Sequence, residues 1–338
     1  MLRASIVGAT GYTGAVLTDL LARHPDVELG TLTSTSYVGR RVADVFPQLR
    51  IEGTYAPYDL SSVAESDLAF VCYPHAQSHP VVADLVDAGV RVVDFSADFR
   101  LRDVAAYPAW YGFDHPRPDL VAEAVYGLPE VYRNRLRDAR LVANPGCFPT
   151  AMLLALLPLA ADGGGLAIVD AKSGVSGAGR TPTDKTHFCA VHDDFKAYSE
   201  IGHRHTPEMA QELGVAAGAP ARVSFTPHLL PVDRGILSTV YWPLAVADAE
   251  ATDQDLTERY RSFYAGEPFV EVVDAAPALK EVQQTNFCRL AVRVDRSAGL
   301  VKVISVIDNL IKGASGQAVQ NMNIMFGLEE PLGLGRRA

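Results

Sequence analysis

A glycine-rich turn near the start of the chain restricts the fold more than any other feature. The segment IVGATGYTG, residues 6–14, follows an apolar run that is typical of a strand and precedes a run that is typical of a helix. Glycines in such a turn let backbone N–H groups and the helix N-terminus approach a pyrophosphate, so the segment indicates a dinucleotide-binding βα unit. Its spacing is GxxGxxG instead of the more familiar GxGxxG, and a tight turn without a ligand is the alternative. The residues that we assign to the cofactor are Gly8, Thr10, Gly11, Tyr12, Thr13 and Gly14.

Strands and helices continue to alternate through the first part of the chain, which is the pattern of a parallel α/β sheet. The expected strands are residues 2–7, 27–33, 68–72, 90–95 and 140–143, and the expected helices are 13–23 and 78–88. Later in the chain strands predominate, at 166–172, 222–230, 236–246, 288–295 and 300–307. The chain is therefore expected to have a second domain with a mixed or antiparallel sheet. A last helical pattern, from Ala318 to Phe326, fits against either domain.

The composition is that of a soluble globular protein with two domains. The chain has 338 residues and a formal net charge of −10, which argues against a general nucleic-acid or anionic-membrane binder. An anionic ligand therefore needs a local binding site. The 4 cysteines show neither a CxxC pair nor metal-ligand spacing, so we expect reduced thiols and no metal. The sequence shows no leader-like start and no run of membrane-spanning length, which predicts a cytoplasmic location and a small-molecule partner.

The end of the second expected strand indicates which dinucleotide is bound. An NAD site favours an acidic residue there for the ribose hydroxyls, but the sequence is TSTSYVGRR, residues 33–41. Hydroxyl and guanidinium groups suit a 2′-phosphate, and we assign Ser34, Ser36 and Arg40 to that group. Glu28 lies near the usual separation for the acid, but it falls at the start of the strand. The sequence therefore favours NADP(H) over NAD.

One of the cysteines lies where a helix N-terminus is expected. Cys147 stands in ANPGCFPT, residues 143–150, ahead of the apolar run AMLLALLPLAA. We expect the helix to begin at Pro149 or Thr150 and to end near Pro158. Unpaired N–H groups and the positive end of the helix dipole stabilise a thiolate there and lower the thiol pKa. Beside a nicotinamide, such a thiolate is predicted to form a thioester that hydride then reduces.

A nucleophilic cysteine needs a partner for its proton, and the chain offers several histidines. His203 and His205 stand in HRHTPE, ahead of a helix whose N-cap is expected at Thr206. A histidine just outside a helix N-terminus is kept neutral near physiological pH, so we prefer His205 as the acid/base and place His203 second. His228, in an expected strand, and His75 are the alternatives.

A second loop rich in glycine and hydroxyl side chains follows the first strand of the second domain. Its sequence is KSGVSGAGR, residues 172–180. Backbone N–H groups near Ser173 and Gly174, together with the guanidinium of Arg180, suit a phosphate group. We assign these three residues to the substrate, while a loop remote from the active site is the alternative.

Eight ordered segments that span nearly the whole chain resemble the N-acetyl-γ-glutamyl-phosphate reductase family of arginine biosynthesis. They are GATGYTG, FSADFRL, YGLPE, NPGCFPT, KSGVSGAGR, HRHTPE, TPHLLPVDRGI and NLIKGASGQAVQNMN. The resemblance implies an α/β Rossmann-type NADP-binding domain and an α+β catalytic domain like that of glyceraldehyde-3-phosphate dehydrogenase. It also implies that the last helix returns to the first domain. We therefore expect residues 1–147 with 310–338 to form the NADP-binding domain, and residues 148–309 to form the catalytic, substrate and oligomerisation domain.

The resemblance implies chemical roles as well. Cys147 is expected to form the thioester, and His203 and His205 to position the substrate and transfer protons. Phe148 stands where the family usually has tyrosine, which removes only a hydroxyl group. The activity implied is NADPH-dependent reduction of N-acetyl-γ-glutamyl phosphate to the semialdehyde, by a homodimer or homotetramer.

Three further residues complete the predicted site: Asn144 near the oxyanion, Arg100 at the substrate and Asn309 at the cofactor. The length of the substrate stays open, because the sequence does not give the depth of the pocket. An N-blocked α-aminoadipyl phosphate of lysine biosynthesis and aspartyl phosphate are the alternatives. An NADP-binding regulator without turnover is an alternative from another class, and the presence of Cys147 with two histidines disfavours it.

Overall fold

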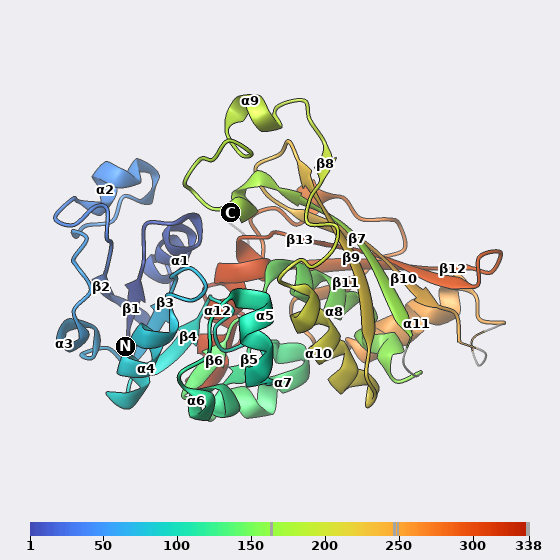
Figure 1. Cartoon of the computed structure of the whole chain (residues 1–338), viewed down its shortest axis with the longest axis horizontal. Coiled ribbons are helices and arrows are strands. Elements are labelled where there is room, and N and C mark those ends of the chain that lie inside the picture. Colours follow the sequence, from blue (N-terminus) through green and yellow to red (C-terminus); the bar gives the residue numbers. More distant parts are fainter. Residues whose placement is uncertain (163–164, 246–247, 249, 336–338) are drawn as a thin grey trace. The chain divides into compact units, whose positions relative to one another are not determined.

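The chain forms two compact units (Figure 1), seen in a computed structural model that describes residues 1–162, 165–245, 248 and 250–335. One unit consists of Met1–Gly146 with Ala314–Ala338, of which 336–338 lie outside the described residues, and the other of Cys147–Gly313. The first unit is therefore built from two separate stretches of sequence. The predicted junctions fall after Cys147 and at residue 310, whereas the units divide just before Cys147 and at Ala314.

The first unit is built on a six-stranded sheet in which every neighbouring pair is parallel. Its strands are β1 (Leu2–Val7), β2 (Val27–Leu32), β3 (Leu68–Val71), β4 (Arg91–Asp94), β5 (Val125–Tyr126) and β6 (Leu141–Ala143), in the order β2-β1-β3-β4-β6-β5. The five strands expected in this unit are present, and their ends differ by no more than one residue. Because β2 and β3 lie on opposite sides of β1, the strand order reverses at β1. Open α/β sheets bind ligands at such a point, beyond the carboxyl ends of the strands.

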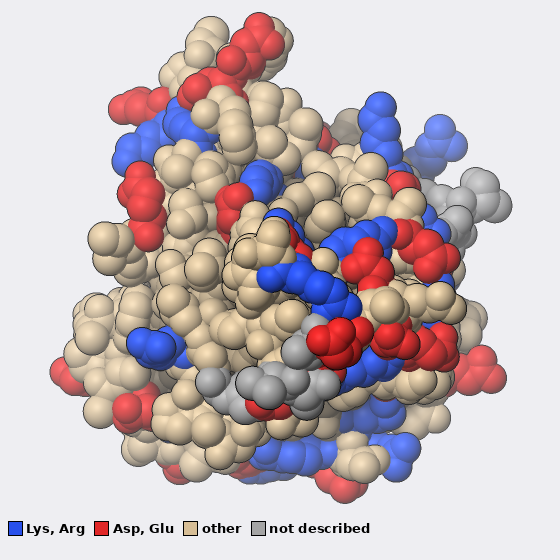
Figure 2. Space-filling model, turned by 90° about the vertical axis from the view of Figure 1, so that its right-hand side faces the viewer, with Lys and Arg blue, Asp and Glu red and all other residues tan. Residues whose placement is uncertain are grey.

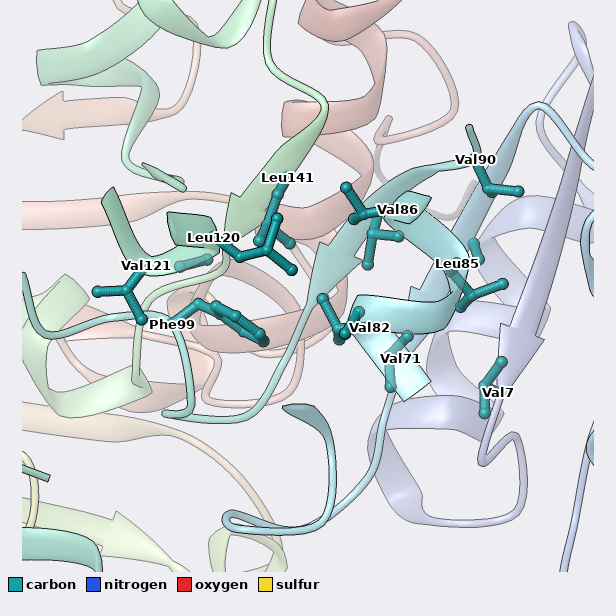
Figure 3. Packing of buried hydrophobic residues seen from close by; sticks show 14 of the residues in the cluster. Val7, Val71, Val82, Leu85, Val86, Val90, Phe99, Leu120, Val121 and Leu141 are labelled. Carbon is teal, nitrogen blue, oxygen red and sulfur yellow. The ribbon is translucent and has the colours of Figure 1, made fainter. Parts of the chain in front are cut away.

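Helices pack on this sheet and complete the core of the unit. They are α1 (Tyr12–Ala22), α2 (Val42–Val45), α3 (Leu60–Val63), α4 (His79–Asp87), α5 (Tyr107–Tyr111), α6 (Pro118–Glu123), α7 (Pro129–Leu136) and α12 (Gly316–Met325). Figure 3 shows part of the core, in which Val82, Leu85 and Val86 of α4 pack with Val7 and Val71 of β1 and β3. All of β3 is buried, as expected for a strand that helices cover on both faces.

The last helix, α12, belongs to the first unit, where it contacts α1, α7 and β4. Every residue of α12 is buried, including four with amide side chains. Two of these amides, those of Gln317 and Asn321, donate hydrogen bonds to the carbonyl oxygen of Gly127, at 3.0 and 2.9 Å. These bonds satisfy polar groups that burial would otherwise make costly, and they fix the position of the helix on the unit.

The second unit contains a seven-stranded mixed sheet. Its strands are β7 (Leu166–Gly174), β8 (Lys196–Ala197), β9 (Arg222–Leu230), β10 (Ile236–Pro243), β11 (Val270–Val272), β12 (Cys288–Asp295) and β13 (Leu300–Ile307), in the order β11-β12-β13-β10-β7-β9-β8. The pairs β7·β9 and β11·β12 are parallel, and the other pairs are antiparallel. The strand expected over 236–246 ends at Pro243, and residue 246 lies outside the described residues. A mixed sheet was one of the two forms predicted.

Helices cover one face of this sheet. The helices of the unit are α8 (Cys147–Ala160), α9 (Phe188–Val191), α10 (Thr206–Ala217) and α11 (Asp253–Phe263). The helix α8 packs on β10 and β13 and also contacts α10 and α11, so these three helices share a face (Figure 1). Alternate residues of β7 are buried beneath them, whereas Leu166 and Ile168 point the other way and are 38% and 42% exposed. The second face of the sheet, which we call the open face, therefore presents apolar side chains.

On the side of the molecule drawn in Figure 2, Lys and Arg side chains lie among Asp and Glu side chains. In the second unit, Arg289 forms an ion pair with Glu271, and Arg261 with Asp274.

The helix α8 begins at Cys147 and ends at Ala160, so it starts earlier than Pro149 and continues past Pro158. A proline inside a helix lacks the N–H that would bond to the carbonyl four residues before it. In α8 that carbonyl belongs to Leu154, and it accepts a 2.5 Å hydrogen bond from the hydroxyl of Tyr264. The hydroxyl thus replaces the missing helical donor, and the helix can pass through Pro158.

Replacing Tyr264 by phenylalanine should destabilise the protein by about 1–3 kcal/mol, because the buried carbonyl of Leu154 then has no donor. Tyr260 provides the matched control, since its buried hydroxyl donates at 2.6 Å to Ala155, whose carbonyl keeps its helical N–H partner. Tyr260→Phe should therefore cost less. Urea unfolding of the two variants measures the difference, and an equal or larger cost for Tyr260→Phe would contradict this account of Pro158.

Candidate active site

The glycine-rich turn after β1 is tight at two of its glycines and open at the third. Gly8 has a φ of +83°, and a Cβ atom on Gly14 would lie 2.7 Å from the Cα atom of Ala9. Gly11, by contrast, is the N-cap of α1, makes no side-chain capping bond, and has no atom within 4 Å of the place where its Cβ would be. The first N–H groups of a helix have no intrahelical partner. The turn therefore offers backbone donors beside open space, as the pyrophosphate of a dinucleotide requires.

Hydroxyl side chains tie this turn to the end of β2. The N–H of Gly8 donates to the Thr33 hydroxyl at 3.0 Å, and the hydroxyls of Thr10 and Ser34 are 3.0 Å apart. The Ser34 oxygen also accepts from the N–H groups of Ser36 and Tyr37, so it shapes the loop that follows the strand. Thr33 was missed in the sequence analysis, because a buried hydroxyl that supports a turn has no pattern of its own.

The loop after β2 fits the extra phosphate of NADP(H). Ser36 and Arg40 are exposed on it, and no acidic side chain occurs between Thr33 and Arg41. Ser34 is buried and its hydroxyl has several partners in the loop, so its contact with the cofactor stays a prediction.

A cavity of about 960 Å³ in the second unit contains the residues predicted for catalysis. Cys147 lines it from the first position of α8, and its thiol is partly exposed. A Cβ atom on Gly313 would lie 2.7 Å from the Cβ of Cys147, so only glycine fits at that position. The structure thus brings Cys147, His203, His205, Ser173 and Gly174 to one cavity.

The two histidines lie side by side against an aromatic ring. His205 is the N-cap of α10, one residue before the position expected, and its backbone N–H donates to Nδ1 of His203 at 3.1 Å. The ring of Phe148 packs edge-on against both imidazoles, with centroids 5.8 and 6.1 Å away. Because Phe148 follows Cys147 in the chain, it links the histidine pair to the start of α8.

Burial keeps His203 neutral. Desolvation, with a smaller contribution from the positive charge of Arg204, lowers the pKa of His203 to about 4. A neutral imidazole has one acceptor nitrogen, and Nδ1 of His203 uses it for the His205 N–H. His203 therefore orients the loop that carries His205 and does not titrate near neutral pH.

The other predicted histidines lie elsewhere. His228 faces away from the cavity, where its Nδ1 is 3.1 Å from a carboxylate oxygen of Asp170 and its ring stacks on Phe195. His75 lies in the first unit and accepts from the N–H of Ala97 at 2.8 Å. Neither is among the residues that line the cavity.

Three residues predicted for the site have contacts that hold the fold together. In the first unit, the Asn144 amide donates to Ala314 and accepts from Asn321, and the Arg100 guanidinium donates to the carbonyls of Asn144 and Phe95. Asn309 belongs to the second unit, where it accepts from the N–H of Gly235 at 2.6 Å and donates to Ser176. Roles for these three residues in ligand binding stay predictions. The same holds for Arg180, which is not among the residues that line the cavity.

The loop between Arg180 and His203 supplies cavity residues that sequence reasoning missed. They are Thr183, Lys185, Thr186, Lys196, Ala197, Tyr198, Ser199, Glu200 and Gly202. Burial and the charge of the Cys147 thiolate raise the pKa of Tyr198, so its hydroxyl stays protonated. This loop has no helical or strand periodicity, so no sequence pattern was present from which these residues could be predicted.

No cluster of three or more His, Cys, Asp or Glu side chains suited to a metal ion occurs among the described residues. Within the same residues, no helix is both long and apolar enough to cross a membrane.

Comparison with known proteins agrees with this arrangement. Residues 3–139 match the family described as semialdehyde dehydrogenase, NAD binding domain, and residues 147–309 match semialdehyde dehydrogenase, dimerisation domain. The solved structure of aspartate semialdehyde dehydrogenase II from Vibrio cholerae, complexed with ASA, has a TM-score of 0.71 at 21% identity and covers 96% of this chain and 98% of its own. At that identity the likeness shows the fold alone. It confirms the predicted two-domain α/β architecture.

Curated relatives are much closer in sequence. N-acetyl-gamma-glutamyl-phosphate reductases from Pelotomaculum thermopropionicum and Symbiobacterium thermophilum are each 50% identical, over 98% of this chain and 97% of their own length. The reductase of Ectopseudomonas mendocina is 48% identical over 100% of this chain and 99% of its own. The chain therefore belongs to the semialdehyde dehydrogenase family and, within it, to the N-acetyl-gamma-glutamyl-phosphate reductases.

Proposed function

We propose that the protein reduces N-acetyl-γ-glutamyl phosphate to N-acetylglutamate 5-semialdehyde and phosphate with NADPH, as a step of arginine biosynthesis. The observation that carries the proposal is the cavity of the second unit, where Cys147 at a helix N-terminus and two histidines lie together. The sequence relatives support the same reaction, because they are named for it and match this chain over nearly their whole length.

In the first half of the reaction, Cys147 acts as the nucleophile. His205 accepts the thiol proton, and the thiolate is stabilised by the N-terminus of α8. The sulfur attacks the acyl carbon, a C–S bond forms, and the C–O bond to phosphate breaks with its electron pair on the oxygen. His205 then returns the proton to the departing phosphate, and a thioester on Cys147 remains.

In the second half, the chain stabilises charge and releases the aldehyde. Bound NADPH supplies the hydride that reduces the acyl group. Backbone N–H groups at the start of α8 stabilise the oxyanion that develops on the former carbonyl. As the C=O bond re-forms, the C–S bond breaks and Cys147 leaves as a thiolate. One proton taken up from solvent through His205 restores the thiol before the next turnover. The neutral state of His203 keeps the pair from carrying two positive charges beside that thiolate.

The first unit provides the residues for NADP(H). The turn from Gly8 to Gly14 would hold the pyrophosphate, and Ser36 and Arg40 on the following loop would contact the 2′-phosphate. A solved structure of a fold relative, aspartate semialdehyde dehydrogenase from Candida albicans, was determined with NADP.

The open face of the mixed sheet supports assembly into a homodimer or homotetramer. Leu166 and Ile168 are exposed there, within the region that matches the dimerisation domain of the family. A second copy on this face would bury that apolar surface. Light scattering distinguishes the masses of two and four chains.

We place the enzyme in the cytoplasm, because Cys147 must stay reduced and all 4 cysteines of the structure are free.

Replacing Cys147 by serine should abolish turnover and leave NADPH affinity near that of the wild type, since a serine hydroxyl is not ionised at neutral pH. The assay follows NADPH formation from N-acetylglutamate 5-semialdehyde, phosphate and NADP⁺. Cys189, exposed in α9, offers the control, and Cys189→Ser should keep full activity. Steady-state turnover by the Cys147 variant would exclude the thioester mechanism, and preference for the semialdehyde of aspartate or of α-aminoadipate would redirect the proposed substrate.

His205→Asn should lower kcat by about two to four orders of magnitude and remove one limb of the pH–rate profile, because the proposed general acid/base is lost. His203→Asn is the comparison. With a pKa of about 4, His203 does not shape the profile near neutrality, so its loss should raise KM and leave the profile unchanged. If the two phenotypes are exchanged, His203 is the acid/base.

Replacing Ser36 by aspartate and Arg40 by leucine together should weaken NADPH binding much more than NADH binding, because a charge-assisted contact is lost and a like charge is added. Both side chains are exposed, so the fold should tolerate the change. Fluorescence titration with each cofactor measures the two dissociation constants. Equal losses for NADPH and NADH would show that the 2′-phosphate is bound elsewhere.

A further inference from the structure

Four charged side chains line the cavity of the second unit, and three of them are positive. They are Lys185, Lys196, Glu200 and Arg204. In a chain with a net charge of −10, this is a local excess of cations. The proposed substrate has an acyl phosphate at one end and an α-carboxylate at the other. A cavity that holds both ends needs a cationic contact away from the phosphate subsite.

The register of three strands directs Lys196 into the cavity. In β8, Lys196 pairs with Leu229 of β9, and Leu229 pairs with Ser173 of β7. Side chains that pair across strands lie on the same face, and all three of these residues line the cavity. Neighbouring strands are about 4.8 Å apart, so the backbone of Lys196 lies roughly 10 Å from that of Ser173.

The ammonium group of Lys196 is held in place and keeps a donor for a ligand. It donates to the carbonyl of Ala190 at 3.0 Å and to the carboxylate of Asp194 at 2.8 Å. These are its hydrogen bonds to the described residues, and an ammonium has three N–H donors. The chain enters and leaves β8 through Asp193 and Ser199, which have φ of 57° and 45°, a conformation uncommon outside glycine. The backbone on both sides of Lys196 therefore adopts a conformation that few residues take, and this conformation defines the course of the segment.

We infer that Lys196 binds the α-carboxylate of the substrate and thereby favours substrates that carry this group over those that lack it. The inference rests on the proposed function. In the glutamyl substrate four carbon–carbon bonds separate the α-carboxylate from the acyl carbon, which is roughly 5 Å in an extended chain. With the acyl phosphate near Ser173 and Gly174, the long side chain of Lys196 spans the remaining distance to the carboxylate.

The test compares two aldehydes that differ only in the α-carboxylate, N-acetylglutamate 5-semialdehyde and 4-acetamidobutanal, each with phosphate and NADP⁺. For Lys196→Gln, kcat/KM with the carboxylate-bearing aldehyde should fall about 10- to 100-fold, mainly through KM, as expected for loss of a charge-assisted hydrogen bond. With 4-acetamidobutanal, kcat/KM should stay unchanged, a result that a merely structural role would not give. Lys196→Arg should recover part of the loss. Lys280→Gln, at an exposed position outside the cavity lining, should match the wild type with both aldehydes.

Three results would overturn the inference while leaving the proposed function intact. The first is an equal loss with both aldehydes, which assigns Lys196 to the fold. The second is a rise in KM for phosphate, which assigns it to the phosphate. The third is a loss of kcat/KM with the carboxylate-bearing aldehyde alone in Lys185→Gln and no such loss in Lys196→Gln. That result would assign the carboxylate contact to Lys185. A wild-type protein that oxidises neither aldehyde would remove the proposed function itself, and the inference with it.

Discussion

The geometry of the candidate catalytic residues depends on the burial of one apolar helix. Every residue of α8 after Cys147 is buried, from Phe148 to Ala160. A helix that is apolar on all sides must be enclosed by protein, and α8 packs on the mixed sheet with α10 and α11 as its neighbours on the same face. Enclosure fixes the helix axis and therefore the position of its first residue. The thiol of Cys147 is thus placed by the packing of side chains far along the helix. Next to it, Phe148 packs against the two histidines, and the backbone at Gly313 lies close to the Cys147 side chain.

Long elements with strong periodicity were predictable from the sequence, and short ones were not. The bounds of β9, β12 and β13 agree with the predicted ranges, because each is a run of eight or nine residues with β-branched or alternating apolar side chains. The two-residue strand β8 has no such pattern and exists through its pairing with β9. Lys196 was missed for that reason. Pro158 was expected to end a helix, but the donor that compensates for it comes from Tyr264, which is remote in sequence.

Residue chemistry alone also could not separate ligand contacts from contacts within the fold. Asn144, Arg100 and Asn309 have side chains suited to phosphates and carboxylates, and the structure shows them bonded to backbone groups of their own units. Cys147 and the two histidines that line one cavity with it were identifiable as candidates because helix N-termini carry a signature of prolines and small polar residues. The side-chain contacts of Asn144, Arg100 and Asn309 have no such signature in the sequence. Their partners are carbonyl and N–H groups that occur at every position of a chain, so only the tertiary structure reveals the pairing.

The divided sequence of the first unit determines the order in which the protein can be completed during synthesis. The second unit is one continuous stretch, Cys147–Gly313, and can fold as soon as that stretch has left the ribosome. The first unit cannot, because α12 follows the whole second unit in the sequence and supplies the amides that bond to Gly127 and Asn144. Until then, the surface that α12 covers is exposed and the carbonyl of Gly127 lacks those donors. The first unit therefore completes its core only after the second unit has been synthesised, although all the strands of its sheet precede that unit in the sequence.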